Sequence, residues 1–135
     1  MFKPFLSLRS AAAIFFTSAL TGCVVSIEVP GSTATPVAFP ARLYPANDLA
    51  SRYGMVNATV TNDLQSRGVF NAVINGEAFV GEATRKSGSG RAGVASGAGN
   101  RGSFLNCEYT LNTATQGTGQ CKLSDGAVFN MHLGN

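Results

Sequence analysis

Alternating apolar and polar residues run through much of the chain and predict β-strands. Within 55–61, apolar residues at 56, 58 and 60 alternate with polar residues at 57, 59 and 61, which is typical of a strand with one buried face. Similar alternation flanks Asn75-Gly76, the dipeptide that most strongly favours a two-residue hairpin turn. The predicted pairs are Ile74–Glu77, Ala72–Phe79 and Phe70–Gly81. This register puts the apolar side chains of both strands on one face, together with Ala83.

The C-terminal third predicts three more strands. Apolar alternation and a Cys107–Cys121 pairing agree on one register, with residues 112–116 as the loop. Its other pairs are Tyr109–Gly119 and Leu111–Gly117. A three-residue turn at 124–126, with Gly126 left-handed, keeps the last strand in phase, whereas a two-residue turn would send Phe129 to the opposite face. The expected pairs are Leu123–Ala127, Cys121–Phe129 and Gly119–Met131.

Residues 23–40 contain three prolines and are interpreted as a semi-extended tether rich in Pro, Ser and Thr, although an edge strand at 24–29 is an alternative. A short strand at 42–45 and one helical turn, capped by Asn47 or Asp48, are expected to follow. The whole pattern predicts an all-β domain over 41–135. We expect a small antiparallel meander of five to six strands, forming a partly closed barrel or a sandwich, stapled by one disulfide.

Residues 1–22 have the pattern of an export signal. Lys3 and Arg9 make a basic start, and the apolar run over 10–20 is too short to span a bilayer as a mature helix. The run ends in Leu20-Thr21-Gly22-Cys23, which resembles the lipobox of bacterial lipoproteins. The resemblance implies cleavage before Cys23 and a diacylglyceryl group on its sulfur, usually with a third acyl chain on its amine. The alternative is that Cys23 is simply a small residue that ends a signal peptide.

Lipid on Cys23 determines the expected location. Two or three acyl chains hold a protein at a membrane surface without a transmembrane helix. Val24 follows the cysteine, whereas in the resembling class an Asp at this position commonly signals retention in the inner membrane. We therefore expect a protein of the bacterial cell envelope, anchored to the outer membrane and facing the periplasm. No cofactor beyond the covalent lipid is predicted.

Removing the signal also removes much of the positive charge. Of 10 basic side chains, loss of Lys3 and Arg9 leaves 8 beside 7 acidic ones, a net charge of +1 once the terminal amine is acylated. Nucleic-acid binding driven by overall charge therefore loses its support. The 113 residues from Cys23 onward are enough for one domain with a modest core.

Cys107 and Cys121 remain as an even pair in an oxidising compartment, so a disulfide is expected. Closing a loop of about fifteen residues contributes roughly 3 kcal/mol in the chain-entropy model. A redox or metal role is the alternative. It lacks the Cys-x-x-Cys spacing and neighbouring His or Cys ligands, so no metal site is predicted.

Residues 86–102 are rich in Gly and Ser, contain no acid, and predict a solvated, mobile loop. With the preceding arginine the segment carries four positive charges, at Arg85, Lys86, Arg91 and Arg101. These side chains are candidates for contact with anionic lipid headgroups or lipopolysaccharide phosphates. Residues 88–93 formally fit Gly-x-Gly-x-x-Gly, but a nucleotide site needs that motif between a buried parallel strand and a helix.

Several short segments of the mature chain carry a second resemblance. They are Leu43-Tyr44-Pro45, Gly76-Glu77-Ala78-Phe79-Val80-Gly81, Cys107-Glu108-Tyr109, Gly117-Thr118-Gly119-Gln120-Cys121 and Ser124-Asp125-Gly126. In this combination the domain resembles a group of small, uncharacterised bacterial envelope lipoproteins with GE-x-F-x-G, C-x-Y and G-x-G-x-C landmarks. The resemblance implies no activity, and the landmarks read as turn, glycine and disulfide positions of a scaffold.

No catalytic residues are predicted. His132 is the only histidine and is expected to face away from the apolar side of the last strand, while Glu77 and Glu82 fall on opposite faces of theirs. None of the motifs HExxH, GxSxG and SxxK occurs. The leading hypothesis is a lipid-anchored structural or interaction module with an envelope protein as partner. The alternatives are a binder of anionic glycolipid or cell-wall glycan through the basic segment, and a hydrolase. The sequence predicts no oligomeric state.

Overall fold

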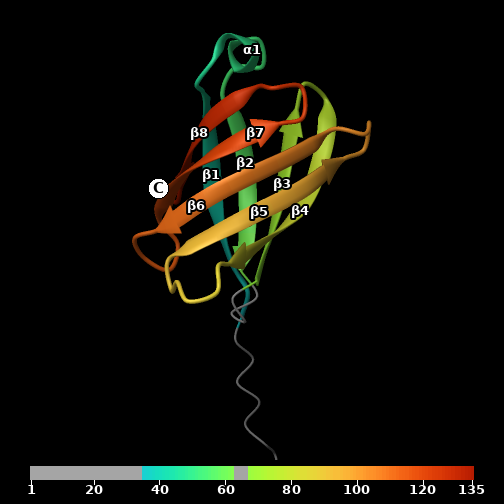
Figure 1. Cartoon of the computed structure of the whole chain (residues 1–135). Helices are drawn as coiled ribbons and strands as arrows, with labels where there is room; N and C mark the ends of the chain where they lie inside the picture. Colours follow the sequence, from blue (N-terminus) through green and yellow to red (C-terminus); the bar gives the residue numbers. More distant parts are fainter. Residues whose placement is uncertain (1–34, 63–66) are drawn as a thin grey trace, which may run out of the picture. The chain divides into compact units, whose positions relative to one another are not determined.

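A computed structural model of the protein describes residues 35–62 and 67–135, so Cys23 and the rest of the lipobox lie outside the described residues. The described residues form a closed barrel of eight antiparallel strands, in which each strand pairs with its neighbours in sequence and the last returns to the first (Figure 1). The strands are β1 (Val37–Pro45), β2 (Val56–Asn62), β3 (Arg67–Ile74), β4 (Glu77–Arg85), β5 (Ala92–Gly99), β6 (Phe104–Leu111), β7 (Gly117–Leu123) and β8 (Val128–Leu133). The predicted all-β antiparallel fold is confirmed, with eight strands instead of five to six.

The strand that the sequence pattern did not predict is β5, which runs through the glycine-rich segment. Residues 86–102 are therefore not one loop, because Ala92–Gly99 pairs with both β4 and β6. The inward-facing glycines of β5 lie beneath larger side chains, with Tyr109 over Gly93, Phe70 over Gly97 and Glu77 over Gly99. A Cβ at these positions would overlap with those side chains. Glycine here permits close approach inside a barrel, which is why a composition typical of loops forms a strand.

The first strand is also longer than predicted, since β1 begins at Val37 and contains Pro40, which the sequence pattern assigned to the tether. The carbonyl of Pro40 accepts a hydrogen bond from Gly134 N at 2.8 Å, so this residue faces the β8 side. Pairing between β1 and β8 ends at Ala41–Leu133. The missing N–H of Pro40 therefore points past the end of the neighbouring ladder, where it removes no strand-to-strand hydrogen bond.

The predicted registers of the two C-terminal hairpins and of the Asn75-Gly76 hairpin are confirmed. Ile74 pairs with Glu77, Cys107 with Cys121, and Cys121 with Phe129. The turn after β7 closes with Leu123 N donating to Ala127 O at 2.8 Å, and Gly126 has a positive φ of 98°. The expected disulfide joins Cys107 and Cys121 across adjacent strands.

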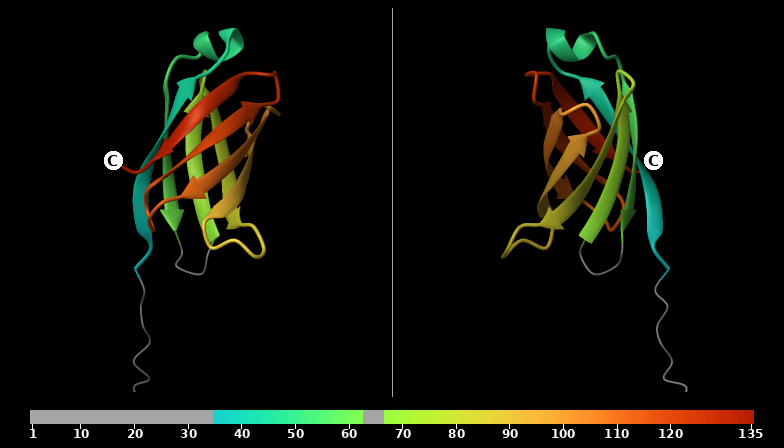
Figure 2. Two further views of the ribbon diagram at one scale, coloured as in Figure 1. Left: turned by 60° about the vertical axis from the view of Figure 1, so that its left-hand side comes forward. Right: turned by 90° about the vertical axis from the view of Figure 1, so that its right-hand side faces the viewer.

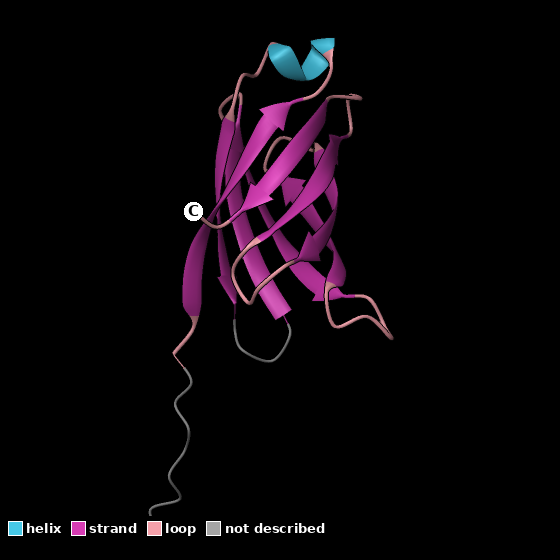
Figure 3. Ribbon diagram, turned by 90° about the vertical axis from the view of Figure 1, so that its left-hand side faces the viewer, coloured by secondary structure: helices cyan, strands magenta, loops and turns pink. Residues whose placement is uncertain are grey.

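The two ends of the barrel differ, as Figures 2 and 3 show. The helix α1 (Asp48–Ser51) lies at the same end of the barrel as the turns that follow β3, β5 and β7, and this end is here called the capped end. Of the two predicted caps, Asn47 is the one that caps this helix, and Ala50 is fully buried. At the other end, here called the cavity end, β1 begins and the chain turns at 86–91 and 112–116. The side chains of the barrel interior form one hydrophobic core between the two ends.

Candidate ligand cavity in the barrel

The interior of the barrel contains an apolar cavity of about 60 Å³. It arises because three adjacent strands place very small residues at neighbouring inward positions, with Gly68 opposite Ala83 and Ala83 opposite Ala95. Elsewhere on β4 and β5 the large Phe70 ring fills the space above the glycines. An eight-stranded barrel is just wide enough for side chains to fill it or for one small ligand. Here the small residues leave a part of the interior unfilled.

The exposed side chains that line the cavity all come from the cavity end, and two of them are arginines, Arg67 and Arg85. Arg85 lies at the end of β4 with inward parity and pairs in register with Gly93. The Tyr109 ring lies over the same glycine. Burial raises the pKa of the Tyr109 phenol, and the positive charge of Arg85 acts in the opposite direction. The rim therefore combines a cation and a neutral hydroxyl donor above an apolar floor.

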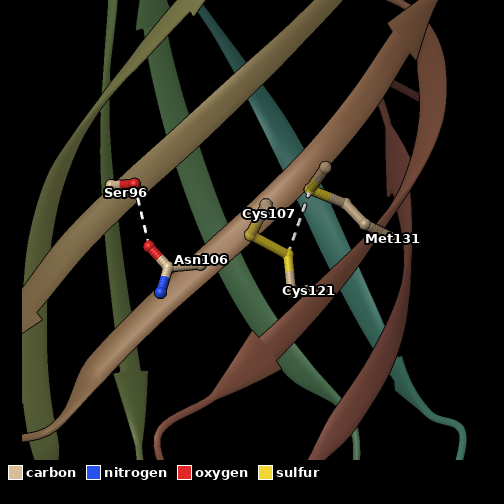
Figure 4. The surroundings of a disulfide bond; sticks show 5 residues. All are labelled: Ser96, Asn106, Cys107, Cys121 and Met131. Atoms are coloured by element: carbon tan, nitrogen blue, oxygen red, sulfur yellow. Dashed lines mark hydrogen bonds between the residues drawn. A yellow bond between two sulfur atoms is a disulfide. The ribbon is translucent and has the colours of Figure 1, made fainter.

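Both cysteines of the disulfide, which is drawn in Figure 4, line the cavity. Both cysteines are buried, and Cys121 Sγ lies 3.8 Å from Met131 Sδ on β8. On the outer face of the neighbouring pair of strands, Ser96 Oγ donates to Asn106 Oδ1 at 2.8 Å. The sulfur atoms of the disulfide and of Met131 contribute polarizable, apolar surface to the cavity. The disulfide is thus a structural element of the wall, and its sulfurs carry no titratable thiol.

The structure divides the four basic residues predicted to contact anionic surfaces. Arg85, Lys86 and Arg91 lie at the cavity end, where Lys86 Nζ forms an ion pair with Glu108 at 3.4 Å. Arg101 lies at the capped end, in the turn after β5, and its guanidinium donates to Asn75 O at 3.4 Å. Formation of β5 separates them, because a strand carries the chain from one end of the barrel to the other. The predicted single basic loop is therefore wrong as a unit.

At the capped end, two carboxylates are held by specific hydrogen bonds. Glu77 Oε1 accepts from Arg101 N at 2.9 Å and from Ser103 N at 3.0 Å. Burial favours the neutral acid, but the hydrogen bonds from Ser103 and Arg101 and the charge of Arg101 outweigh it, so the pKa of Glu77 lies below its ordinary value. Glu77 is the buried glutamate of β4 and Glu82 is exposed, which confirms that they fall on opposite faces.

Asp125 is the second carboxylate of the capped end. The Tyr53 hydroxyl donates to its Oδ2, and Ala127 N donates to its Oδ1 at 2.8 Å. The hydrogen bond from Tyr53 and that from Ala127 lower the pKa of Asp125, and the same Tyr53–Asp125 bond raises the pKa of the phenol. Tyr53 thereby ties the chain after α1 to the β7–β8 turn. These hydrogen bonds hold the two side chains in place.

His132 faces outward on β8, and its ring meets the Tyr44 ring edge-on with centroids 5.6 Å apart. Within residues 35–62 and 67–135, no group of His, Cys, Asp and Glu side chains has the arrangement of a metal site. The described residues also include no helix long and apolar enough to cross a membrane.

The sequence pattern predicted that Tyr109 pairs with Gly119, which is confirmed, but not that Tyr109 lies at a cavity rim. Arg67 was not predicted as a site residue, because the cavity exists only where β3, β4 and β5 meet and β5 was missed. The available signal was the set of small residues at every second position in this part of the chain, namely Gly93, Ala95, Gly97 and Gly99. No family model, curated protein or solved structure matches this chain.

Proposed function

We propose that this chain is a bacterial envelope lipoprotein, held at the outer membrane by lipid on Cys23, whose barrel is a noncatalytic binding module. The observation that supports the proposal most is that the chain coming from the anchor enters the barrel at the same end as the basic side chains. The chain from Cys23 joins β1 at the cavity end, where Arg85 and Lys86 also lie. The 13 residues between Cys23 and Val37 span at most about 50 Å when extended. The cavity end therefore stays within reach of the anchoring membrane.

Mass spectrometry of the protein recovered from separated membranes tests this proposal. We expect a mature chain beginning at Cys23, carrying two or three acyl chains, in the outer-membrane fraction. A Cys23→Ser variant should lose both the lipid and the membrane fraction while keeping the Cys107–Cys121 disulfide. Recovery of wild-type protein as an unmodified soluble chain would contradict the proposal.

The interaction hypothesis has its own test. Crosslinking in intact envelopes, followed by purification of the wild-type chain, should recover a defined protein partner. The matched control is the Cys23→Ser variant, which has the same barrel but lacks the lipid sulfur. A partner recovered equally with both variants would show that binding does not require the anchor. Repeated recovery of no partner would contradict a role as a protein-interaction module.

A second candidate function is contact with anionic headgroups through the cavity end, because three of the predicted cations gather there. Each basic residue near an anionic surface contributes about 1 kcal/mol, or about fivefold in affinity. Cosedimentation with anionic vesicles, compared with neutral ones, should therefore show at least this loss for Arg91→Glu, because the substitution removes a positive charge and adds a negative one. Arg101→Glu, which makes the same charge change at the capped end, is the control. Equal losses in both variants would exclude the cavity end as the contacting surface.

A further inference from the structure

The apolar cavity and the charged residues at its rim form a single amphipathic site. Its inner wall is lined by small and apolar side chains, among them Ala83, Ala95 and Leu133. Its exposed rim holds the guanidinium of Arg85 and the phenol of Tyr109. No hydrogen bond or ion pair joins Arg85 to another side chain of the described residues. An apolar interior below a cation complements a molecule with an alkyl chain and an anionic head.

The volume limits the size of the alkyl chain. One water molecule needs at least about 10–15 Å³ of cavity volume and occupies about 30 Å³ in the liquid, so 60 Å³ accommodates a few water-sized groups. A methylene is close to water in size. The cavity therefore accepts a short alkyl segment and excludes most of a long membrane acyl chain. Displacing poorly held water from such an apolar wall favours binding.

The geometry points to a binding site for a short-chain fatty-acid anion, with the alkyl end in the cavity and the carboxylate at the rim beside Arg85 and Tyr109. Arg85 attracts the carboxylate, and the neutral Tyr109 hydroxyl is placed to donate a hydrogen bond to it. The inference concerns the barrel alone and does not rest on acylation of Cys23, so its failure would leave the proposed anchoring intact.

A chain-length series tests the inference directly. The full chain carrying Cys23→Ser, which has no attached lipid, is titrated with acetate, butanoate, hexanoate, octanoate and decanoate by calorimetry. Each methylene that enters the cavity should tighten binding by about fourfold. The gain should stop once the alkyl chain fills the cavity, before decanoate. Absence of any chain-length dependence would overturn the inference, and so would a gain that continues undiminished through decanoate.

Two charge variants separate the head from the tail. Arg85→Gln should weaken octanoate binding by about three- to tenfold and leave octan-1-ol, which has the same chain and no charge, unaffected. Arg52→Gln, at the end of α1, makes the same change at the capped end and should alter neither ligand. Equal effects of the two substitutions on octanoate would show only a general charge effect and would overturn the site.

Two filling variants test the cavity itself. Ala83→Leu projects into the space opposite Gly68 and should abolish the chain-length dependence. Gly68→Ala is the milder variant, because its Cβ would meet Val60 Cγ1 at 3.4 Å and Ala83 Cβ at 3.5 Å, which are ordinary contacts. It should end the chain-length gain one carbon earlier. If Gly68→Ala folds and shows the same dependence of binding on chain length as the wild type, the ligand does not enter the barrel, and the inference is overturned.

Discussion

The same eight strands form both ends of this barrel, but one end is closed by hydrogen-bonded polar side chains and the other contains unfilled space. At the capped end the polar side chains have specific partners. The Asn47 side chain makes three hydrogen bonds, and Glu77 accepts two backbone N–H groups. At the cavity end, Gly68 and Ala83 leave space and Arg85 stands at the rim. Satisfied networks stabilise and cavities do not, so stability and binding are expected to reside at different ends.

The largest test of this comparison removes the disulfide that lies between the ends. A Cys107→Ala/Cys121→Ala variant frees a link with a sequence separation of 14, which should lower the free energy of unfolding by about 3 kcal/mol. Urea unfolding measures the loss. Amide hydrogen exchange should rise most around 112–116, at the cavity end, and least around α1. A loss below about 1 kcal/mol, or faster exchange confined to the capped end, would contradict the proposed difference in stability between the two ends.

The next effect comes from a glycine in the tightly packed part of β4. A Cβ on Gly81 would lie 2.5 Å from Phe70 Cε1 and 2.5 Å from Gly97 Cα, so Gly81→Ala forces the ring and a neighbouring strand apart. We expect a loss of about 2–3 kcal/mol in the free energy of unfolding. Gly90→Ala, in the 86–91 turn, has nothing within 4 Å and serves as the control in thermal unfolding. Equal melting temperatures for the two variants would disprove close packing at β4 and β5.

Substitution of Asn47 tests how much the cap of α1 contributes to the free energy of unfolding. Its Oδ1 accepts from Ala50 N at 2.9 Å and from Val128 N at 3.1 Å, and its Nδ2 donates to Gly126 O at 2.9 Å. Asn47→Ala should therefore cost about 1–2 kcal/mol, since it uncaps α1 and releases the β7–β8 turn. Asn130→Ala, an exposed position on β8, should stay within about 0.5 kcal/mol of wild type. Denaturant midpoints of the two variants give the comparison, and a cost equal to that of Asn130→Ala would show that the cap contributes nothing.

Acid should act on the capped end. The pKa values of Glu77 and Asp125 are lowered in the folded protein, so these carboxylates stabilise it above the unfolded values of about 4. This stability is lost as the pH falls through the lowered pKa values. The melting temperature of wild type should thus fall more between pH 6 and pH 3 than that of Asp125→Asn. Glu108→Gln, which removes an exposed ion pair at the cavity end, should follow the wild-type curve.

Most of the fold was predictable because local patterns and long-range pairing agree. Asn75-Gly76 fixed one hairpin, and the positions of Cys107 and Cys121 fixed another before any contact was known. Strand β5 was not predictable in this way. Gly93 and Gly97 are present because Tyr109 and Phe70 need the space above them, and those residues come from other strands. A composition of glycine and serine looks the same in a loop and in a strand packed under aromatic rings.

The site was less predictable than the fold for the same reason. Charge alone grouped Arg85 with Arg101, but β5 carries the chain between them to the opposite end of the barrel. The cavity depends on Gly68, Ala83 and Ala95 meeting across three strands, which requires the registers of β3, β4 and β5 together. No short motif encodes such a space. A site formed by missing side chains leaves little signal in the sequence.

The smallest expected effect has the opposite sign and most directly contrasts the two kinds of glycine. Gly68→Ala adds a methyl group with only ordinary contacts, to Val60 and Ala83, and the φ of Gly68 is not positive. Alanine also restricts the unfolded chain, so we expect a gain of about 0.4–1 kcal/mol in the free energy of unfolding. Thermal unfolding of Gly68→Ala and Gly81→Ala under the same conditions measures the expected gain in stability at one glycine and the expected loss at the other. Because one methyl group stabilises where the barrel is empty and destabilises where it is full, a loss at Gly68 would mean that its surroundings are as tightly packed as those of Gly81.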